Sequence, residues 1–130
     1  MSGEYYQLLR RRASRFLLRA QRDLTEGDYD GACFNAEQAI QLAAKALLYK
    51  YFAETPRIHS SKTLLARLRN LFMDADRNDI ASLIGRLTAD HRDGLDLLEE
   101  SYTMARNGAI SYGEKQAKQC VETAKKALEV

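Results

Sequence analysis

The sequence predicts an all-α fold, an antiparallel up-and-down bundle of about five helices, in a single domain that spans residues 1–130. The chain contains one proline and seven glycines, so few positions interrupt a helix. Apolar residues recur every three or four positions over long stretches, whereas the alternation with period two that is typical of strands does not persist. The connections between these stretches are short, which favours antiparallel neighbouring helices.

The composition is that of a globular domain, with 45% apolar and 29% charged residues and a mean hydropathy of −0.46. This composition excludes disordered and collagen-like chains. No apolar run approaches the roughly 20 residues needed to cross a bilayer, and the amino end lacks the apolar stretch of a secretory signal. We therefore expect a cytoplasmic protein without membrane contact. The two histidines and two cysteines are not at ligand spacing, so we expect no metal, no cofactor and two buried thiols, Cys33 and Cys120.

The first helix is expected from about Glu4 to Thr25, with Gly27 ending it. Its buried stripe consists of Leu9, Ala13, Phe16, Ala20 and Leu24. Residues 1–22 contain six arginines and one acid, a net charge of +5, so the remainder carries −3. Another face of this helix carries Arg11, Arg15, Arg19 and Arg22. Two interpretations remain for that face: a solvated helix surface, or a surface that contacts nucleic-acid phosphates.

The second helix is expected to begin after the N-cap Asp28 and to run to about Ala53. Pro56 prevents it from continuing further. A ridge of small residues with heptad-like spacing allows another helix, inside the bundle or in a second subunit, to approach closely. The ridge consists of Ala32, Ala36, Ala39, Ala43 and Ala46.

Further helices follow in the second half of the chain. Ser60 or Ser61 is expected to cap the third helix, and an aspartate-rich break follows at 74–79. A short helix over 80–87 then either ends or continues, with a bend near 91–94, into a helix that carries Leu95, Leu98, Tyr102 and Ala105. The last helix is expected to begin at a capping box formed by Ser111 and Glu114 and to bury Ala117, Cys120, Val121, Ala124 and Leu128.

The segment 27–48 reads GDYDGACFNAEQAIQLAAKALL and resembles the signature helix of the HEPN domain (higher eukaryotes and prokaryotes nucleotide-binding). The resemblance continues at 59–60, 64–65 and 102–106, and covers about Arg12 to Glu129. It implies a helical bundle that is commonly a homodimer. It also implies, as a possible partner, a minimal nucleotidyltransferase in a toxin–antitoxin or related defence module.

Many members of this family are metal-independent endoribonucleases whose motif is an arginine, a polar residue and a histidine four to six positions after the arginine. The arginine and the polar residue match Arg106 and Asn107, but no histidine follows. Ser111 lies five positions after Arg106, within the interval where the motif has its histidine. A serine hydroxyl hardly ionises near neutral pH, whereas a histidine serves there as acid or base. We therefore expect no catalytic residues. The alternative is a ribonuclease with a diverged site at Arg106, Asn107 and Ser111.

The expected ligand site combines Arg106 and Asn107 with the free amides at the start of the last helix, which suit a phosphate. Arg106 pairing with Glu99 is the structural alternative. Tyr112 either stacks on a base or packs at the helix start. Gln38 and Lys45 lie seven residues apart and match family positions, with polar packing as the alternative.

The two histidines are assigned structural positions, and the alternative is that one of them replaces the missing motif histidine, although neither is adjacent to Arg106 along the chain. His59 matches a family position and is expected at the start of the third helix, and His91 is expected on an exposed helix surface. The sequence thus predicts a non-catalytic HEPN-type protein that binds a nucleotide or RNA, or docks a nucleotidyltransferase. A structural adaptor without a ligand is the third possibility.

Overall fold

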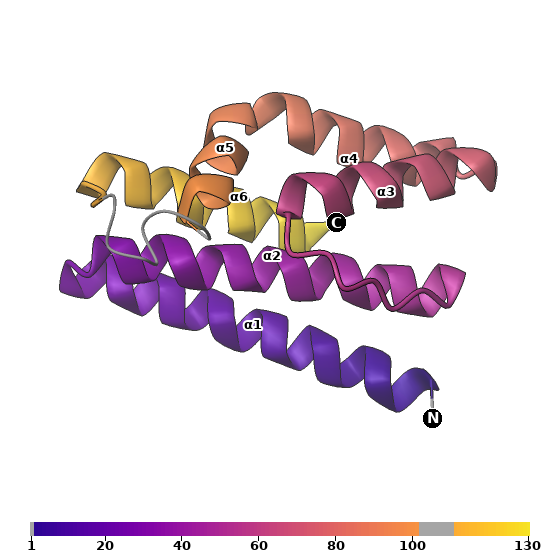
Figure 1. The fold of residues 1–130 in the computed structure, drawn as a ribbon, viewed down its shortest axis with the longest axis horizontal. Helices are drawn as coiled ribbons and strands as arrows, with labels where there is room; N and C mark the ends of the chain where they lie inside the picture. Colours follow the sequence, from indigo (N-terminus) through magenta and orange to yellow (C-terminus); the bar gives the residue numbers. More distant parts are fainter. Residues whose placement is uncertain (1, 102–110) are drawn as a thin grey trace.

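The computed structural model describes residues 2–101 and 111–130, and the structural statements below refer to these residues (Figure 1). They form six α-helices and no strand, which confirms the all-α prediction. The helices are α1 (Ser2–Glu26), α2 (Tyr29–Phe52), α3 (Ser61–Asp74), α4 (Asn78–Asp90), α5 (Arg92–Glu100) and α6 (Glu114–Glu129).

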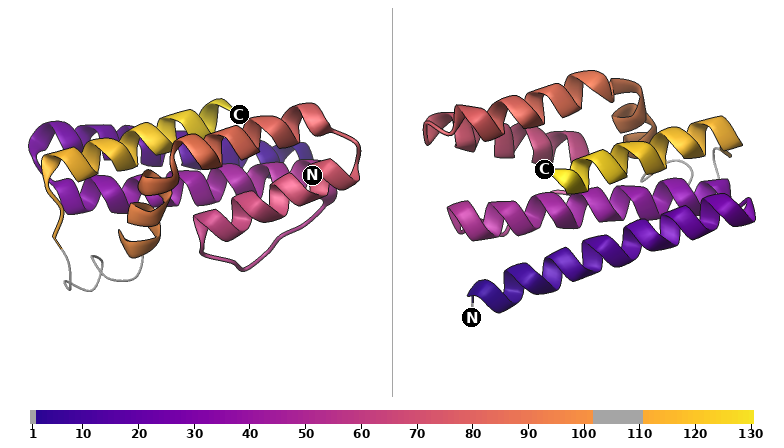
Figure 2. Two further views of the ribbon diagram at one scale, coloured as in Figure 1. Left: turned by 90° about the horizontal axis from the view of Figure 1, so that it is seen from above. Right: turned by 180° about the vertical axis from the view of Figure 1, so that it is seen from behind.

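The helix α2 lies at the centre of the bundle and contacts α1, α3, α5 and α6. Figures 1 and 2 show α1 on one side of α2 and the other helices on the opposite side. The alanine ridge of α2 is buried completely or almost completely, so it packs inside the subunit. The largest buried side chains around α2 are Ile40, Leu48, Leu64, Leu68, Phe72, Ile84, Leu95 and Leu98.

Two helix starts follow the sequence prediction closely. Asp28 is the N-cap of α2, and its side chain accepts a hydrogen bond of 3.0 Å from the backbone of Gly31. Gly27, just before it, has a φ of 82°, which a glycine adopts without strain. Ser60 is the N-cap of α3 and accepts a hydrogen bond from the backbone of Thr63. Local side-chain chemistry therefore fixes both starts.

The bend expected near 91–94 is a break between α4 and α5 at His91. Beyond the break, α5 packs closely on α6. A Cβ atom added to Gly94 would lie 2.0 Å from Oγ1 of Thr123, so only glycine allows this approach.

The capping box predicted at Ser111 is wrong. The helix α6 begins at Glu114 with Gly113 as N-cap, and the backbone N–H of Gly113 donates to Oε1 of Gln116 at 2.8 Å. Ser111 lies outside the helix and is exposed. The backbone N–H of Tyr112 donates instead to the Asp30 carboxylate on α2 at 2.7 Å. This contact with α2 holds the chain outside the helix for two residues longer than the local pattern predicts.

Cys33 and Cys120 are both buried free thiols, as predicted. The helices of the described chain include none with the length and apolar character that a membrane crossing requires.

Candidate functional site

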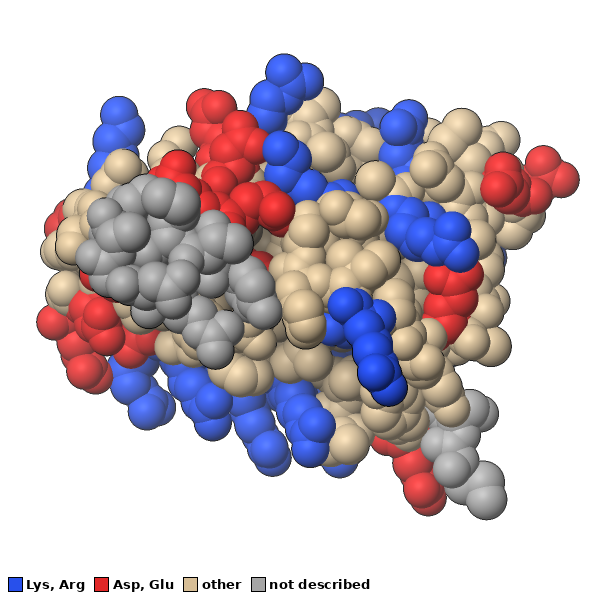
Figure 3. All heavy atoms as spheres, viewed as in Figure 1, with Lys and Arg blue, Asp and Glu red and all other residues tan. Residues whose placement is uncertain are grey.

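Four arginines of α1, here called the arginine row, face water between residues 11 and 22. The row consists of Arg11, Arg15, Arg19 and Arg22, and all four are exposed. Ala13 and Ala20, on the opposite side of α1, are completely buried. Figure 3 shows basic side chains along the lower edge of the molecule, over α1. This exposure is common to both interpretations of the face, a solvated surface and a surface that contacts phosphates.

Among the described residues, the arginine row lacks neutralising partners. Within residues 2–101 and 111–130, no arginine of α1 forms an ion pair. Arg19 lies over the Phe16 ring, 5.1 Å from its centroid. Arg10, outside the row, donates to the Leu128 carbonyl at 3.2 Å and ties α1 to α6. The charge of the row is thus directed at the solvent, where it attracts anions.

An aromatic pair lies near the amino end of the arginine row. Tyr5 on α1 is 40% exposed and meets Tyr49 on α2 edge to face, with 4.6 Å between the ring centroids. Tyr5, Arg12 and Arg19 recur every seven residues, so they lie on one flank of α1. Aromatic and basic side chains therefore share this flank.

Gln38 and Lys45 are half-buried on α2. Lys45 and Tyr49 are four residues apart, and Gln38 and Lys45 are seven apart, so all three share one face of α2. Because Tyr49 touches Tyr5, this face continues the flank of α1 described above. Burial lowers the pKa of Lys45, and the charge of Glu37 acts in the opposite direction.

A buried carboxyl group lies next to this face and was not predicted from the sequence. Glu37 is completely buried and accepts hydrogen bonds from the side chains of Gln41 and Ser61, the latter at 2.9 Å. Gln41 also donates to the carbonyl of His59 at 2.8 Å. Burial raises the pKa of Glu37 to about 7, although both hydrogen bonds lower it. A glutamate within an alanine-rich, buried stretch was the available signal.

A second carboxylate lies close enough to Glu37 to raise its pKa further. Glu99 of α5 accepts hydrogen bonds from the Ser60 hydroxyl at 2.7 Å and from the backbone of Lys62 at 3.2 Å. The two carboxyl groups therefore link α2 and α5 to the start of α3. Their contacts are structural ones within the bundle.

Tyr112 packs in the core rather than presenting its ring to a ligand. It is 6% exposed, and its hydroxyl lies 3.3 Å from the Leu97 carbonyl and 3.1 Å from the Glu100 carboxylate. Burial and the charge of Glu100 raise the pKa of Tyr112. Of the two interpretations of Tyr112, the structure shows packing at the helix start. Arg106, Asn107 and Tyr102 lie outside the described residues.

The sequence model of the HEPN domain matches residues 6–130. The chain belongs to the HEPN domain family. Membership points to a nucleotide- or RNA-related function, and HEPN domains often dimerise. No match was found among curated proteins or among solved structures.

In this HEPN domain, His59 lies far from Ser111. The carbonyl of His59 is bonded to Gln41, and the amide of Tyr112, next to Ser111, is bonded to Asp30. These two positions on α2 are 11 residues apart, about 16 Å along a helix. Within one subunit, the main chain therefore holds His59 away from the position of Ser111.

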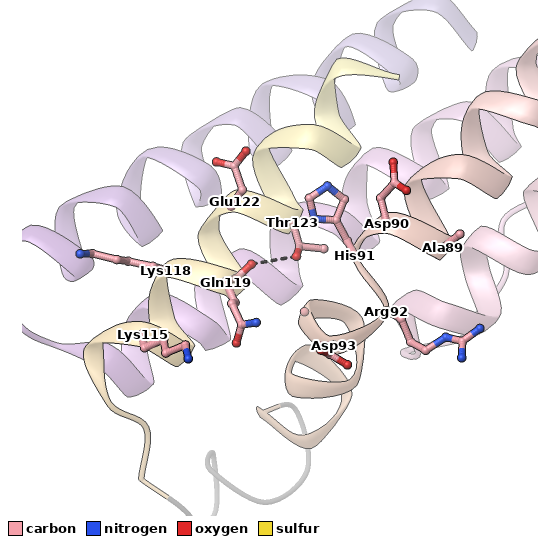
Figure 4. A pocket seen from close by; sticks show the side chains of 11 residues that line it. Ala89, Asp90, His91, Arg92, Asp93, Lys115, Lys118, Gln119, Glu122 and Thr123 are labelled. Carbon is pink, nitrogen blue, oxygen red and sulfur yellow. Dashed lines mark hydrogen bonds between the residues drawn. The ribbon is translucent and has the colours of Figure 1, made fainter.

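The sequence predicted that His91 lies on an exposed helix surface, and this prediction is wrong. His91 is half-buried at the break between α4 and α5, because the helical path ends there. It lines a hollow of about 610 Å³ against α6, opposite Gln119 and Thr123 (Figure 4). Acidic and basic side chains both line this hollow, so it has no preference for ligands of one charge.

Among the described residues, no cluster of three or more His, Cys, Asp or Glu is arranged to hold a metal.

Proposed function

We propose that this HEPN domain binds nucleic acid through the arginine row and does not cleave it by the arginine–histidine chemistry of its family. The observation that carries the proposal is a row of four exposed arginines with no ion pair in the described chain. A nucleic acid presents a phosphate chain of uniform negative charge, which matches such a row along its length.

The geometry of the row favours a polymer over a single small anion. From Arg11 to Arg22 the row extends about 16 Å, because an α-helix rises about 1.5 Å per residue. Like charges four residues apart destabilise a helix by a few tenths of a kcal/mol. Phosphates along the row relieve this repulsion at each arginine. The aromatic ring of Tyr5 on the neighbouring flank adds a surface for bases.

The absence of cleavage is proposed from the identity of the residue at 111. Serine stands where the family motif has a histidine, and Ser111 is exposed. The main chain holds His59 at a distance, and His91 faces α6 in a separate hollow. No imidazole of the described subunit therefore occupies the position of the motif histidine.

A protein partner is the second part of the proposal, and it rests on the family resemblance. A homodimer and a minimal nucleotidyltransferase in a toxin–antitoxin or defence module are the partners that the resemblance implies. A partner that docks on the arginine row must present carboxylates there, and it would compete with RNA. Competition between the two for this row is the behaviour expected.

The test is fluorescence anisotropy with labelled RNA of about 12 nucleotides. We compare the wild type with the triple variant Arg11→Gln, Arg15→Gln, Arg22→Gln. The matched control removes three positive charges from α6 through Lys115→Gln, Lys118→Gln, Lys125→Gln. We expect the first variant to lose at least tenfold in affinity and the control to lose much less. Equal losses would show non-specific attraction and contradict the proposal, as would no binding by the wild type.

Cleavage is measured in the same samples by gel electrophoresis in the presence of a chelator. We expect intact RNA. Cleavage that disappears in Arg106→Ala would establish the diverged ribonuclease instead and overturn the non-catalytic half of the proposal.

A further inference from the structure

We propose that a groove between α3 and α4 is a separate anion site that takes the phosphoryl groups of a small phosphorylated ligand. The groove has a volume of about 490 Å³. Its polar and basic lining residues are Lys62, Arg69, Ser82, Thr88 and Arg92. It lies across α2 from α1, so it is not a continuation of the arginine row (Figures 1 and 2).

The charges that line the groove are all positive. Lys62 pairs with Asp96, outside the groove, at 2.7 Å. Arg69 and Arg92 form no ion pair with any residue of the described chain. Among the described residues, neither of these two guanidinium groups on the concave surface has an ion-pair partner, and Arg92 also borders the hollow against α6, which includes acidic side chains.

A glycine in the middle of α4, Gly85, leaves room for the side chain of Arg69. A Cβ atom added to Gly85 would lie 3.1 Å from Nε of Arg69 and 3.5 Å from its Cζ. Gly85 thus lets the guanidinium lie directly against the backbone of α4. A glycine inside a helix is less stable than an alanine, and Gly85 has no positive φ that would require it. A glycine at position 85 therefore leaves space for the guanidinium group of Arg69, which forms no ion pair with a carboxylate of the described chain.

The chemistry of the groove fits a phosphoryl group. Guanidinium groups bind phosphate oxygens through paired hydrogen bonds, and Ser82 adds an exposed hydroxyl. The volume falls within the range of small-ligand sites. The phosphoryl groups can belong to a free nucleotide or to the 5′ end of an RNA, and the same chemistry recognises both.

The test is isothermal titration calorimetry of the full chain with pyrophosphate. Arg69→Gln with Arg92→Gln removes the charge and keeps the groove. Gly85→Leu keeps both charges and fills the groove. The matched control is Arg86→Gln, an exposed arginine of α4 outside the lining. We expect at least a tenfold loss of affinity in the first two variants and less than a twofold change in the control, with unchanged far-ultraviolet circular dichroism in all three.

The opposite outcomes overturn the proposal. They are no binding of pyrophosphate by the wild type, retained binding in Gly85→Leu, or an equal loss in Arg86→Gln. Further titrations with ATP and with RNA carrying a 5′-triphosphate or a 5′-hydroxyl identify the source. Tighter binding of ATP supports a free nucleotide, and a preference for the triphosphate over the hydroxyl end supports an RNA terminus. Because these variants leave the arginine row unchanged, failure here leaves the proposed function standing.

Discussion

At the scale of single residues, Glu37 combines complete burial with a polar environment. A buried carboxylate is unfavourable unless it is hydrogen-bonded, and Gln41 and Ser61 supply two hydrogen bonds. Burial outweighs these two hydrogen bonds and raises the pKa of Glu37 to about 7, compared with an ordinary value of 4.5. The native state therefore holds this proton more tightly than the unfolded chain, which makes stability depend on pH.

We predict that the stability of the wild type falls as pH rises from about 4.5 to about 7, because ionising Glu37 is harder in the native state. The stabilisation is complete below the lower value and lost above the upper one. The full effect is on the order of 3 kcal/mol. Glu37→Gln should lack this fall, so urea unfolding at pH 5 and pH 8 should show a much smaller difference in the variant. Equal pH differences in both proteins would contradict the prediction.

At the scale of helices, one contact between helices and one exposed aromatic ring lead to direct predictions. The first is the approach of α5 to α6. Gly94→Ala should destabilise the protein by about 1–3 kcal/mol, because Thr123 is buried and leaves no space for a methyl group. Thermal unfolding measures the loss. Gly3→Ala is the control, since nothing lies within 4 Å of a Cβ there. A stable Gly94→Ala would show that the two helices are less closely packed.

The second prediction concerns Tyr5, at the amino end of α1. If its ring stacks on unpaired bases, Tyr5→Ala should lower the affinity for single-stranded RNA by about 1–3 kcal/mol. Affinity for a duplex of equal length should stay unchanged, because the bases of a duplex are already stacked. Tyr5→Phe keeps the ring and should bind as the wild type does. Anisotropy with both RNAs makes the comparison, and equal losses for the two RNAs would rule out stacking.

At the scale of the whole molecule, the charges are unevenly distributed. Residues 1–22 carry +5 and the remainder −3. In Figure 3, basic side chains line the lower edge over α1, and acidic ones gather at the left end, where α5 lies and α6 begins; other acidic groups lie at the right and other basic ones along the top. A nucleic-acid strand bound to α1 is therefore attracted by the basic edge and repelled by the acidic end at α5 and the start of α6. This distribution favours one face for a polyanion although the net charge is only +2.

This uneven distribution predicts a strong salt dependence. Single-strand binding loses about 0.7 in the logarithm of the binding constant per tenfold rise in salt for each phosphate contact. Four contacts on the arginine row give a slope of about −3, and the triple arginine variant should reduce it to about −1. A slope near zero for the wild type would show that phosphates are not what the row binds.

Much of the fold could be predicted from the sequence because it depends on local signals. Apolar spacing predicts the helices, and Asp28 and Ser60 cap helices as their residue types suggest. The start of α6 could not be predicted, because Asp30, distant in sequence, holds the chain before it. The place of His91 depends on how α5 turns towards α6.

The candidate site follows the same division. The exposure of the arginine row follows from helical periodicity alone, and so does the shared face of Gln38 and Lys45. The Glu37 cluster and the groove between α3 and α4 arise where helices from different parts of the chain meet. Contacts between helices that are distant in the sequence cannot be predicted from local sequence patterns.

The thiols of Cys33 and Cys120 are both buried inside the bundle. The neighbouring Cys33 and burial raise the pKa of the Cys120 thiol. Native protein is therefore expected to react slowly with thiol reagents. A cysteine introduced at an exposed position of α1 becomes the preferred attachment point for a fluorophore or a spin label. The natural chain thus lends itself to distance measurements without prior removal of its own cysteines.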